Sequence, residues 1–488
     1  MIQQESRVTV AIRDLPAIVV KLLERAPPQL LSGVHGQLNL FVRYIRSKPG
    51  RGLAITYSAG TLNGPRAKRT NSSDRLVTVS LPEALPAGTQ IRFPARPFQD
   101  AALEVPEPGI LTTDAGLVVQ VFPADHGLPA LAASCTPAPD GPVFSALETA
   151  ARIQLSDSSW HLTSAKAERV RYKPSSRCVL RYTLLLERTT QEGILQHDLT
   201  LFGKLYSHPD QACSIQEKTQ QLYAEQAQTG QPVIPRPLGI VETLGLSLSE
   251  AVQSPKAADP LRTGLRALQP CFKRGRGGEI IDMVIPCEEL RVTAAGLARL
   301  HTSAVLPAGA PRTGAKEAKR VRERAELIAA HNPAQAEDAH RVGNQLARRL
   351  EALEPDAYRP AHGGFKASQL LFHSHRVFVV DLDAFCLADP ALDVGYFKAY
   401  LRPNGLWRHR PGMRQWFEAS AASFVNAYRE VLHERGIEKT VTYGIVERAR
   451  FYEAAILFKI ATRRVNRLNS PRPGELSSML TEIVHLMK

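Results

Sequence analysis

The sequence lacks any long run of apolar residues. Nowhere in its 488 residues does an apolar stretch approach the roughly 18 residues that a membrane-spanning helix needs. The longest candidate near the beginning, residues 15–23, is interrupted by Lys21. It also lacks the basic start and the small-residue cleavage site of a signal peptide. We therefore expect a cytoplasmic protein with no membrane partner.

Cysteine is scarce and scattered. The six cysteines form no Cys-x-x-Cys pair and have no histidine at metal-ligand spacing, so they predict neither a zinc site nor a disulfide framework. For Cys386, a packed loop position is favoured over contact with a nearby metal site. We expect reduced thiols, most of them buried, at Cys135, Cys178, Cys213, Cys271, Cys287 and Cys386.

Positive charge is absent from one internal stretch. Residues 97–151 contain no lysine or arginine but carry seven acidic residues and eight prolines. Residues 1–100 hold 14 Lys and Arg against 6 Asp and Glu, which gives +8 of the net +14. A basic region can bind nucleic acid, but the basic cluster at 66–69 has no interleaved aromatic residues to stack bases. The acidic stretch suggests docking within the chain as readily, so a nucleic-acid partner is not expected.

Two short segments carry the most specific pattern. Residues 361–369 read Ala-His-Gly-Gly-Phe-Lys-Ala-Ser-Gln, and residues 379–383 read Val-Val-Asp-Leu-Asp. The apolar segments between them predict a hairpin that would present Gln369 and Asp381 together. Phosphoryl transfer uses such a pair, because an amide oxygen and a carboxylate hold Mg²⁺ against the phosphates. It also uses a group that orients the acceptor hydroxyl, and by spacing that group falls at Gly364.

This pattern resembles the signature of the aminoglycoside phosphotransferase and choline kinase-like family, which reads His-Gly-Asp, then Asn, then Ile-Asp, then Gly-Asp-Pro-x-x-Asp-Leu. The matching residues are His362-Gly363-Gly364, Gln369, Val380-Asp381 and residues 388–394, so glycine replaces the catalytic aspartate. The resemblance covers about residues 160–470. It implies ATP and Mg²⁺ as ligands and a small-molecule alcohol as the acceptor.

The resemblance further implies an α+β, two-lobed protein-kinase-like fold. Residues 151–250 would form its β-rich N-lobe and residues 251–488 its helical C-lobe. The N-terminal region, residues 1–150, has no assigned role. It is expected to be β-rich, since Lys48-Pro49 is flanked by strand-like segments in the same way as Lys173-Pro174.

Roles for the motif residues follow from the same resemblance. Gln369 and Asp381 would hold Mg²⁺, and Asp393 would brace the loop rather than bind metal. His362 would be structural, with a general-base role as the alternative. Asp383 would face the same side as Asp381 if the strand continues. Lys366, Asp383 or His362 could partly replace the missing base, and Asp383 is the most plausible of the three if metal does not fully engage it.

The β-rich lobe is expected to contact the nucleotide. Strands are predicted at 169–172, 178–185 and 199–206. Lys204 on the third strand would neutralise the α- and β-phosphates, held by Glu217 of the next helix or, as runner-up, by Glu225. The turn between the first two strands could cradle a phosphate through amides, hydroxyls and charge, although an ordinary hairpin turn is the alternative. Its residues are Lys173, Ser175, Ser176 and Arg177.

The remaining segments predict helices. Residues 315–354 predict one or two exposed helices broken near Asn332-Pro333, and the chain from Met413 onward predicts helices with buried faces. Together the observations predict an ATP- and Mg²⁺-dependent small-molecule phosphotransferase that glycine at position 364 would make slow. A nucleotide-binding pseudokinase that serves as a sensor or scaffold is the alternative. A basic-surface module that binds nucleic acid ranks third.

Overall fold

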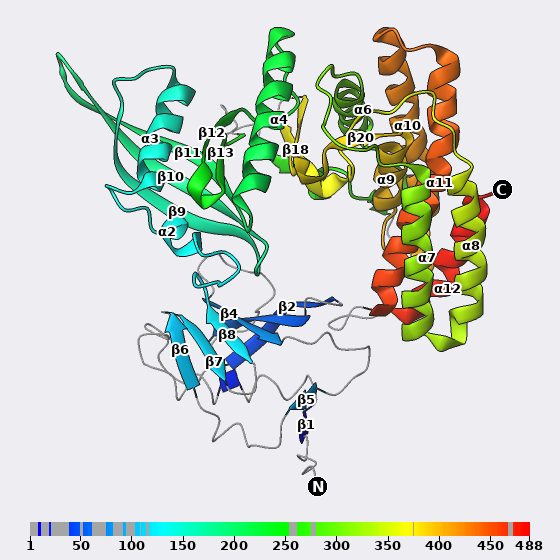
Figure 1. Cartoon of the computed structure of the whole chain (residues 1–488). Coiled ribbons are helices and arrows are strands. Elements are labelled where there is room, and N and C mark those ends of the chain that lie inside the picture. Colours follow the sequence, from blue (N-terminus) through cyan, green and yellow to red (C-terminus); the bar gives the residue numbers. More distant parts are fainter. Residues whose placement is uncertain are drawn as a thin grey trace. The chain divides into compact units, whose positions relative to one another are not determined.

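The computed structural model describes residues 8–10, 19–20, 39–48, 52–60, 75–81, 91–93, 103–107, 109–113, 117–252, 261–274, 280–373, 375–466 and 472–488. The chain divides into two compact units (Figure 1). The first comprises residues 1–216 and 237–250, and the second comprises residues 217–236 and 251–488. Helix α4 (Pro209–Gln228) carries the chain from the first unit into the second, and residues 237–250 return to the first.

The N-terminal part of the first unit is a six-stranded antiparallel sheet. Its central strands are apolar and β-branched, and residues 53–58 of β3 are all buried, so this strand is covered on both faces. The expected β-rich character is confirmed, although the Lys48-Pro49 turn itself and the basic cluster at 66–69 lie outside the described residues. In order across the sheet, the strands are β2 (Asn39–Lys48), β3 (Gly52–Gly60), β4 (Arg75–Leu81), β8 (Val118–Val121), β7 (Ile110–Thr113) and β6 (Leu103–Glu107). A separate pair joins β1 (Val8–Val10) and β5 (Ile91–Phe93).

A five-stranded antiparallel sheet forms the rest of the first unit. Alternate residues of β10 are buried, which produces one apolar face, and α3 (Pro142–Leu155) packs on this sheet along β9, β12 and β13. A shorter helix, α2 (Leu131–Cys135), contacts β9. The order is β12 (Pro237–Val241), β13 (Leu246–Glu250), β11 (Gly193–Tyr206), β10 (Arg177–Thr190) and β9 (His161–Lys173). The three predicted strands exist but are longer than predicted, because polar residues extend the β10–β11 hairpin.

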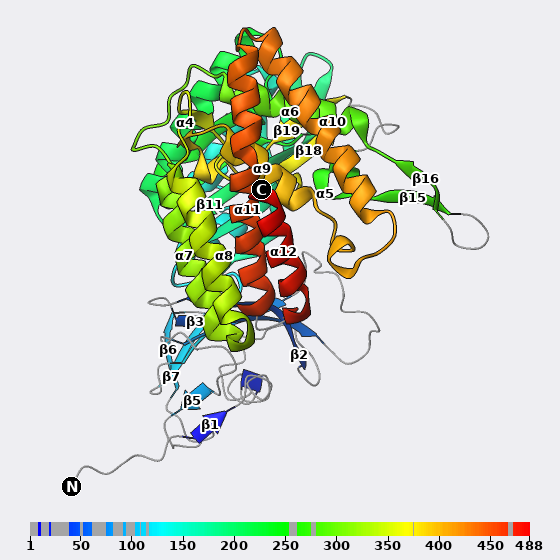
Figure 2. The same ribbon diagram turned by 90° about the vertical axis from the view of Figure 1, so that its right-hand side faces the viewer.

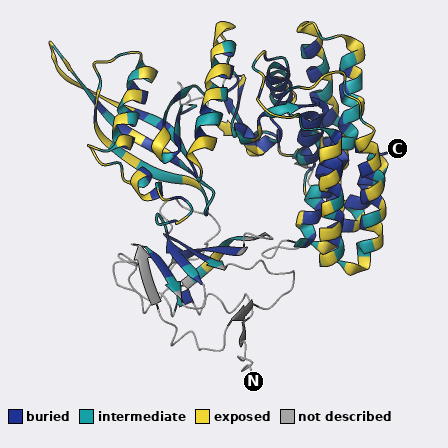
Figure 3. Ribbon diagram, in the orientation of Figure 1, coloured by how far each residue is buried: buried dark blue, intermediate teal, exposed yellow. Residues whose placement is uncertain are grey.

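The second unit is mainly helical. Figure 2 shows α7 (Gly314–His331), α8 (Ala336–Glu351), α11 (Lys439–Asn466) and α12 (Leu476–Leu486) running alongside one another. The predicted break near Asn332-Pro333 is confirmed, since a 3₁₀ turn at Pro333–Gln335 separates α7 from α8. The outer faces of α7 and α8 are exposed (Figure 3). Most of α9 (Ala391–Leu401) is buried, and this helix packs against α11.

Short strands and two further helices complete the second unit. Helices α6 (Cys287–His301) and α10 (Met413–Glu434) pack against each other. A short helix, α5 (Gly264–Ala267), follows the two-residue strand β14 (Arg262–Thr263). The hairpin β18 (Leu370–His373) and β19 (Arg376–Val379) pairs with β14. Two other antiparallel pairs are β15 (Cys271–Arg274) with β16 (Ile280–Val284), and β17 (Arg359–Ala361) with β20 (Cys386–Ala388).

The structure bears on the expectations for membrane-spanning helices and for the cysteines. Among the described residues, no helix has the length and apolar character that a membrane crossing requires. All six cysteines are free thiols, as expected. The expectation that most are buried is wrong, because only Cys178 is fully buried, whereas Cys271 and Cys287 are exposed.

Candidate active site

The β18–β19 hairpin brings Gln369 and Asp381 together. Leu370 pairs with Val379, and the ladder extends one residue further because the Val380 amide donates to the Gln369 carbonyl at 2.9 Å. The two side chains then meet, and Gln369 Nε2 donates to Asp381 Oδ2 at 3.3 Å. The predicted juxtaposition of an amide and a carboxylate therefore exists, and local hairpin geometry produces it.

Two features of this pair bear on the predicted magnesium site. Gln369 Oε1 is buried and has no hydrogen-bond partner among the described residues, so an acceptor oxygen is left over once Nε2 has bonded to Asp381. Asp381 adopts a left-handed conformation (φ 70°, ψ 52°), which is uncommon for a non-glycine residue. Such strained backbone conformations cluster at active sites and ligand-binding sites. Amide and carboxylate oxygens are the ligands that Mg²⁺ prefers, and substrate phosphates and water complete its shell.

The expected relation between Asp381 and Asp383 is wrong. It required the strand to continue, but β19 ends at Val379 and a 3₁₀ turn follows at Leu382–Ala384. The alternation of strand side chains therefore does not apply beyond Val379. Asp383 lies half-buried in this turn and engages other groups.

The loop before the hairpin contains two glycines with different constraints. Gly363 has φ 72°, and a Cβ added there would lie 2.3 Å from the Ala384 carbonyl oxygen, so only glycine fits. Gly364 has no such constraint, because a Cβ added there meets only Tyr396 Cζ, at 3.9 Å. Packing thus leaves room for a Cβ at position 364, so the backbone there does not require glycine.

Asp393 braces this loop from beneath. Its carboxylate accepts hydrogen bonds from the Gly363 and Phe365 amides, each at 3.3 Å. His301 Nε2 lies 3.4 Å from Asp393 Oδ2, and His301 Nδ1 lies 2.6 Å from the Tyr428 hydroxyl. Burial raises the pKa of Asp393, but the hydrogen bond from His301 and the backbone hydrogen bond from Phe365 hold it below its usual range. This buried, ionised carboxylate has the geometry of the loop brace that the sequence suggested.

His362 connects the same loop to the end of β19. Its Nε2 lies 3.2 Å from the Val380 carbonyl, so this nitrogen carries the proton and donates. Burial lowers the pKa of His362, which keeps the fully buried ring neutral. The arrangement favours the structural role, since a general base must reach the acceptor hydroxyl.

Arg312 is a loop contact that the sequence did not reveal. Its NH1 donates to the Gly363 carbonyl at 2.6 Å, and its Nε donates to Glu317 Oε1 at 2.6 Å. Glu317 is itself buried and is also bonded to Arg320. No motif marked Arg312, because it precedes the loop by 51 residues and acts on a backbone oxygen.

In the first unit, the predicted phosphate loop contacts Asp125. The Ser175 amide donates to Asp125 Oδ2 at 2.8 Å and the Ser175 hydroxyl donates to Asp125 Oδ1 at 3.2 Å. The Ser176 amide donates to the Lys173 carbonyl at 3.1 Å. Asp125 thus takes up the Ser175 amide and hydroxyl. These contacts favour the ordinary hairpin turn between Lys173 and Arg177, and binding of a phosphate by Ser175 and Ser176 stays a prediction.

Lys204 lies on β11 as predicted, opposite Val179 of β10 and Ser247 of β13. Its Nζ lies 5.1 Å from the centroid of the Tyr206 ring, two residues along the strand. Both residues make further contacts, so Lys204 is held in place by its surroundings.

The two glutamates suggested as partners of Lys204 are engaged elsewhere. Glu217 lies on the exposed face of α4, where it accepts a hydrogen bond from Gln221. Glu225 accepts hydrogen bonds from the Ser303 hydroxyl and the Ala304 amide. The inward-facing polar residue of that turn is Gln216, which is buried and whose Nε2 has no partner within the described part of the chain.

Comparison with known proteins agrees with the geometry of the second unit. Residues 283–435 match the model of the phosphotransferase enzyme family. The matched segment includes His362, Gly364, Gln369, Asp381 and Asp393. The fold is of the expected α+β class, with a β-rich N-terminal region and a helical C-terminal part.

Several solved kinases are similar to the chain at low identity. A glucosamine kinase (crystal form A) is 16% identical, with 97% of this chain and 98% of that chain covered and a TM-score of 0.42. A putative aminoglycoside phosphotransferase from Ralstonia eutropha JMP134 is 16% identical, with coverages of 70% and 97% and a TM-score of 0.40. Choline kinase LicA from Streptococcus pneumoniae is 13% identical, with coverages of 70% and 98% and a TM-score of 0.39. No curated protein matches the chain.

Proposed function

We propose that the protein is a cytoplasmic, ATP- and Mg²⁺-dependent phosphotransferase of the aminoglycoside phosphotransferase type that acts on an alcohol group of a small molecule. The family match of residues 283–435 supports a small-molecule phosphotransferase. The observation that carries the nucleotide and metal assignment is the Gln369–Asp381 pair, with a buried amide oxygen left without a partner.

Each residue then has a defined role. Asp381 and Gln369 hold Mg²⁺ through one carboxylate and one amide oxygen. When bound, the ion neutralises charge on the transferring phosphoryl group. Asp393, His301 and Arg312 fix the backbone of residues 363–365, and so fix the position beside which the acceptor hydroxyl has to lie. Lys204 contacts the α- and β-phosphates, as this fold implies.

Glycine at position 364 shapes the mechanism. No side chain at this position orients the hydroxyl or takes its proton. In a loose transition state the hydroxyl keeps its proton until late, so positioning and charge neutralisation supply much of the rate. A general base contributes typically 10²–10⁴-fold. The chain is therefore a slow kinase rather than an inert one.

The test is to monitor ATP turnover by the full-length protein with ³¹P NMR in the presence of Mg²⁺. Wild type should convert ATP to ADP, and Asp381→Asn should abolish this conversion because the metal loses its carboxylate. Asp338→Asn, which changes an exposed carboxylate on α8, is the matched control and should leave turnover unchanged. Turnover that is equal in wild type and Asp381→Asn would contradict the assignment.

A nucleotide-binding pseudokinase is the second candidate, and the missing side chain at Gly364 is the observation that favours it. A pseudokinase would bind ATP through Asp381 and show no Mg²⁺-dependent turnover. The same NMR series distinguishes the two, because only the phosphotransferase produces ADP above the buffer rate.

A further inference from the structure

Two stacked tyrosines on α9 lie beside the catalytic loop, which we define as residues 361–369. Tyr396 on α9 is the residue nearest to the missing side chain, with its Cζ 3.9 Å from a Cβ placed on Gly364. Tyr400, one turn further along α9, stacks on Tyr396 with ring centroids 5.3 Å apart and an interplanar angle of 12°. A molecule whose hydroxyl lies beside position 364 would therefore lie along this pair of rings.

Cations surround the two rings. Lys459 Nζ donates a hydrogen bond to the Tyr396 hydroxyl and lies 4.8 Å from the Tyr396 ring centroid. Arg463, one turn further along α11, donates from NH1 to the Tyr400 hydroxyl at 3.1 Å. Lys366 Nζ, from the catalytic loop, lies 5.8 Å from the Tyr396 centroid and 5.7 Å from the Tyr400 centroid. Three cations, two from α11 and one from the loop at Lys366, thus lie around the same pair of rings.

Among the described residues, no carboxylate pairs with either of the two α11 cations, Lys459 and Arg463. Burial, together with the charges of Arg463, Arg324, Arg312 and Lys366, lowers the pKa of Lys459 to about 7. Positive charge gathered in this way is unfavourable without an anion, so the cluster has the electrostatic character of an anion site.

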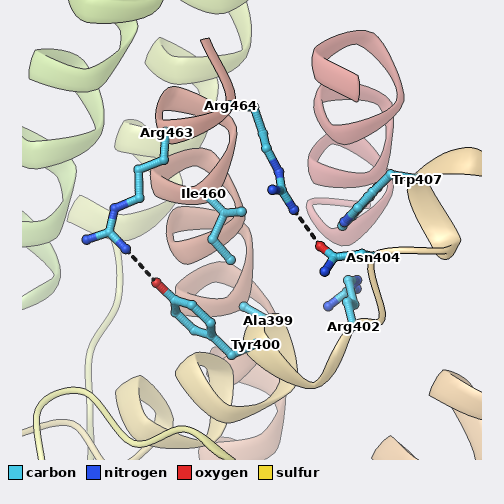
Figure 4. A pocket seen from close by; sticks show the side chains of 8 residues that line it. All are labelled: Ala399, Tyr400, Arg402, Asn404, Trp407, Ile460, Arg463 and Arg464. Carbon is cyan, nitrogen blue, oxygen red and sulfur yellow. Dashed lines mark hydrogen bonds between the residues drawn. The ribbon is translucent and has the colours of Figure 1, made fainter. Parts of the chain in front are cut away.

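A pocket of about 200 Å³ continues from Tyr400 and Arg463 (Figure 4). Two of its three arginines are already paired with carboxylates: Arg402 with Glu453 and Glu482, and Arg464 with Glu475. Arg463 has no such partner and points to Tyr400 at the edge of the pocket. The volume is below the roughly 300–1,000 Å³ of sites for drug-sized ligands, so it suits one group of a small molecule. Its lining residues are Ala399, Tyr400, Arg402, Asn404, Trp407, Ile460, Arg463 and Arg464.

We propose that the phosphoryl acceptor carries an anionic group, a phosphate monoester or a carboxylate, which Lys459 and Arg463 bind beside the Tyr396–Tyr400 pair. The inference rests on the proposed function, because the phosphotransferase reaction places the acceptor hydroxyl beside position 364. The Arg463 guanidinium offers paired donors that suit carboxylate and phosphate oxygens. A cationic acceptor would be repelled by the same surface.

The anion site can be tested without nucleotide. We would titrate sodium sulfate into the full-length protein by calorimetry at pH 6.5, where Lys459 is largely protonated, against sodium chloride at equal ionic strength. Saturable sulfate binding is expected, weakened at least about tenfold by Lys459→Met or Arg463→Gln, since each removes a charge-assisted hydrogen bond. Lys439→Gln, at an exposed position on the same helix, is the matched control. Sulfate that binds no better than chloride, or equally well to Lys459→Met, would overturn the proposal.

Competition against sulfate identifies the class of anion. Glucose 6-phosphate is expected to displace sulfate if the site takes a phosphate monoester, and gluconate if it takes a carboxylate, whereas glucose should displace nothing. Failure of both anions, or displacement by ATP without metal, would contradict an acceptor site. Because sulfate binding requires neither ATP nor transfer, a protein that turns over ATP but binds no sulfate refutes this inference alone. One that binds sulfate but not ATP refutes the proposed function.

Discussion

Position 364 is where this chain departs most from a kinase active site. Glycine is not demanded there, since a Cβ would meet only one atom within 4 Å. We predict that Gly364→Asp raises ATP turnover by at least about tenfold, because an added carboxylate can orient the hydroxyl and take its proton. The initial rate of ADP formation measures this. Gly474→Asp, which adds the same side chain where no atom lies within 4 Å, should leave the rate unchanged.

A different outcome at this residue would be informative. No gain in Gly364→Asp, with ATP still bound, would contradict a slow kinase and support the pseudokinase. High wild-type turnover that is lost in Asp383→Asn would place the base at Asp383 instead.

Lys459 is expected to reduce stability at neutral pH. Its pKa is lowered to about 7 in the folded protein, against a usual value near 10.4, so between these values the unfolded chain binds more protons than the native one. The contribution of Lys459 to the unfolding free energy therefore rises with pH across this window and is least favourable below pH 7.

We predict that Lys459→Met raises the thermal midpoint by a few degrees at pH 6.5 relative to wild type, and that the gain shrinks or reverses at pH 9.5. The comparison is the variant-minus-wild-type difference at each pH, from thermal unfolding followed by circular dichroism. Lys439→Met, at an exposed position, should show no such pH dependence. A Lys459→Met protein that is less stable than wild type at pH 6.5 would show that the cation is compensated.

Among the elements, the turn between β9 and β10 is held by hydrogen bonds to Asp125. Asp125 accepts hydrogen bonds from Ser175 and from the Tyr172 hydroxyl, the latter at 2.7 Å. We predict that Asp125→Ala destabilises the protein by ~1–3 kcal/mol, the cost of leaving buried donors unsatisfied, and leaves ATP affinity unchanged. Chemical denaturation and ATP titration measure the two effects. Asp140→Ala, at an exposed position, is the control. A gain in ATP affinity in Asp125→Ala would favour the phosphate-loop interpretation.

The elements that sequence could predict are those set by local pattern. The β18–β19 hairpin follows from apolar residues on both sides of a polar turn, and the break between α7 and α8 follows from Asn332-Pro333. The turn that begins after Asp381 could not be predicted from the sequence. It depends on the left-handed backbone of Asp381, which no local pattern indicates. Glu217 and Gln216 differ by one position on α4, and pattern alone did not fix which faces inward. The Tyr396–Lys459 contact joins residues 63 apart and left no local signal.

At the scale of the whole molecule, the net charge of +14 has a partial explanation. Lys366, Lys459 and Arg463 gather around one pair of tyrosines in the second unit, so part of the excess serves a local surface. We predict only weak, nonspecific binding to duplex DNA, which should fall steeply as salt rises from 50 to 200 mM because neutralised phosphates release counterions. Fluorescence anisotropy at both salt concentrations measures this. Tight, sequence-selective binding at the higher salt would instead favour the nucleic-acid module.

We propose that the chain binds ATP through a metal ion held by Asp381, and that Lys204 contacts the phosphates. The most direct measurement is a calorimetric titration of ATP into the full-length protein, with and without Mg²⁺. We predict Mg²⁺-dependent binding by wild type, its loss in Asp381→Asn, and a weakening of ~1–3 kcal/mol in Lys204→Ala, the loss expected for a charge-assisted contact. Lys166→Ala, at an exposed position on β9, should bind as wild type does. No affinity of wild type for ATP at millimolar concentration, with either Mg²⁺ or Mn²⁺, would contradict the account.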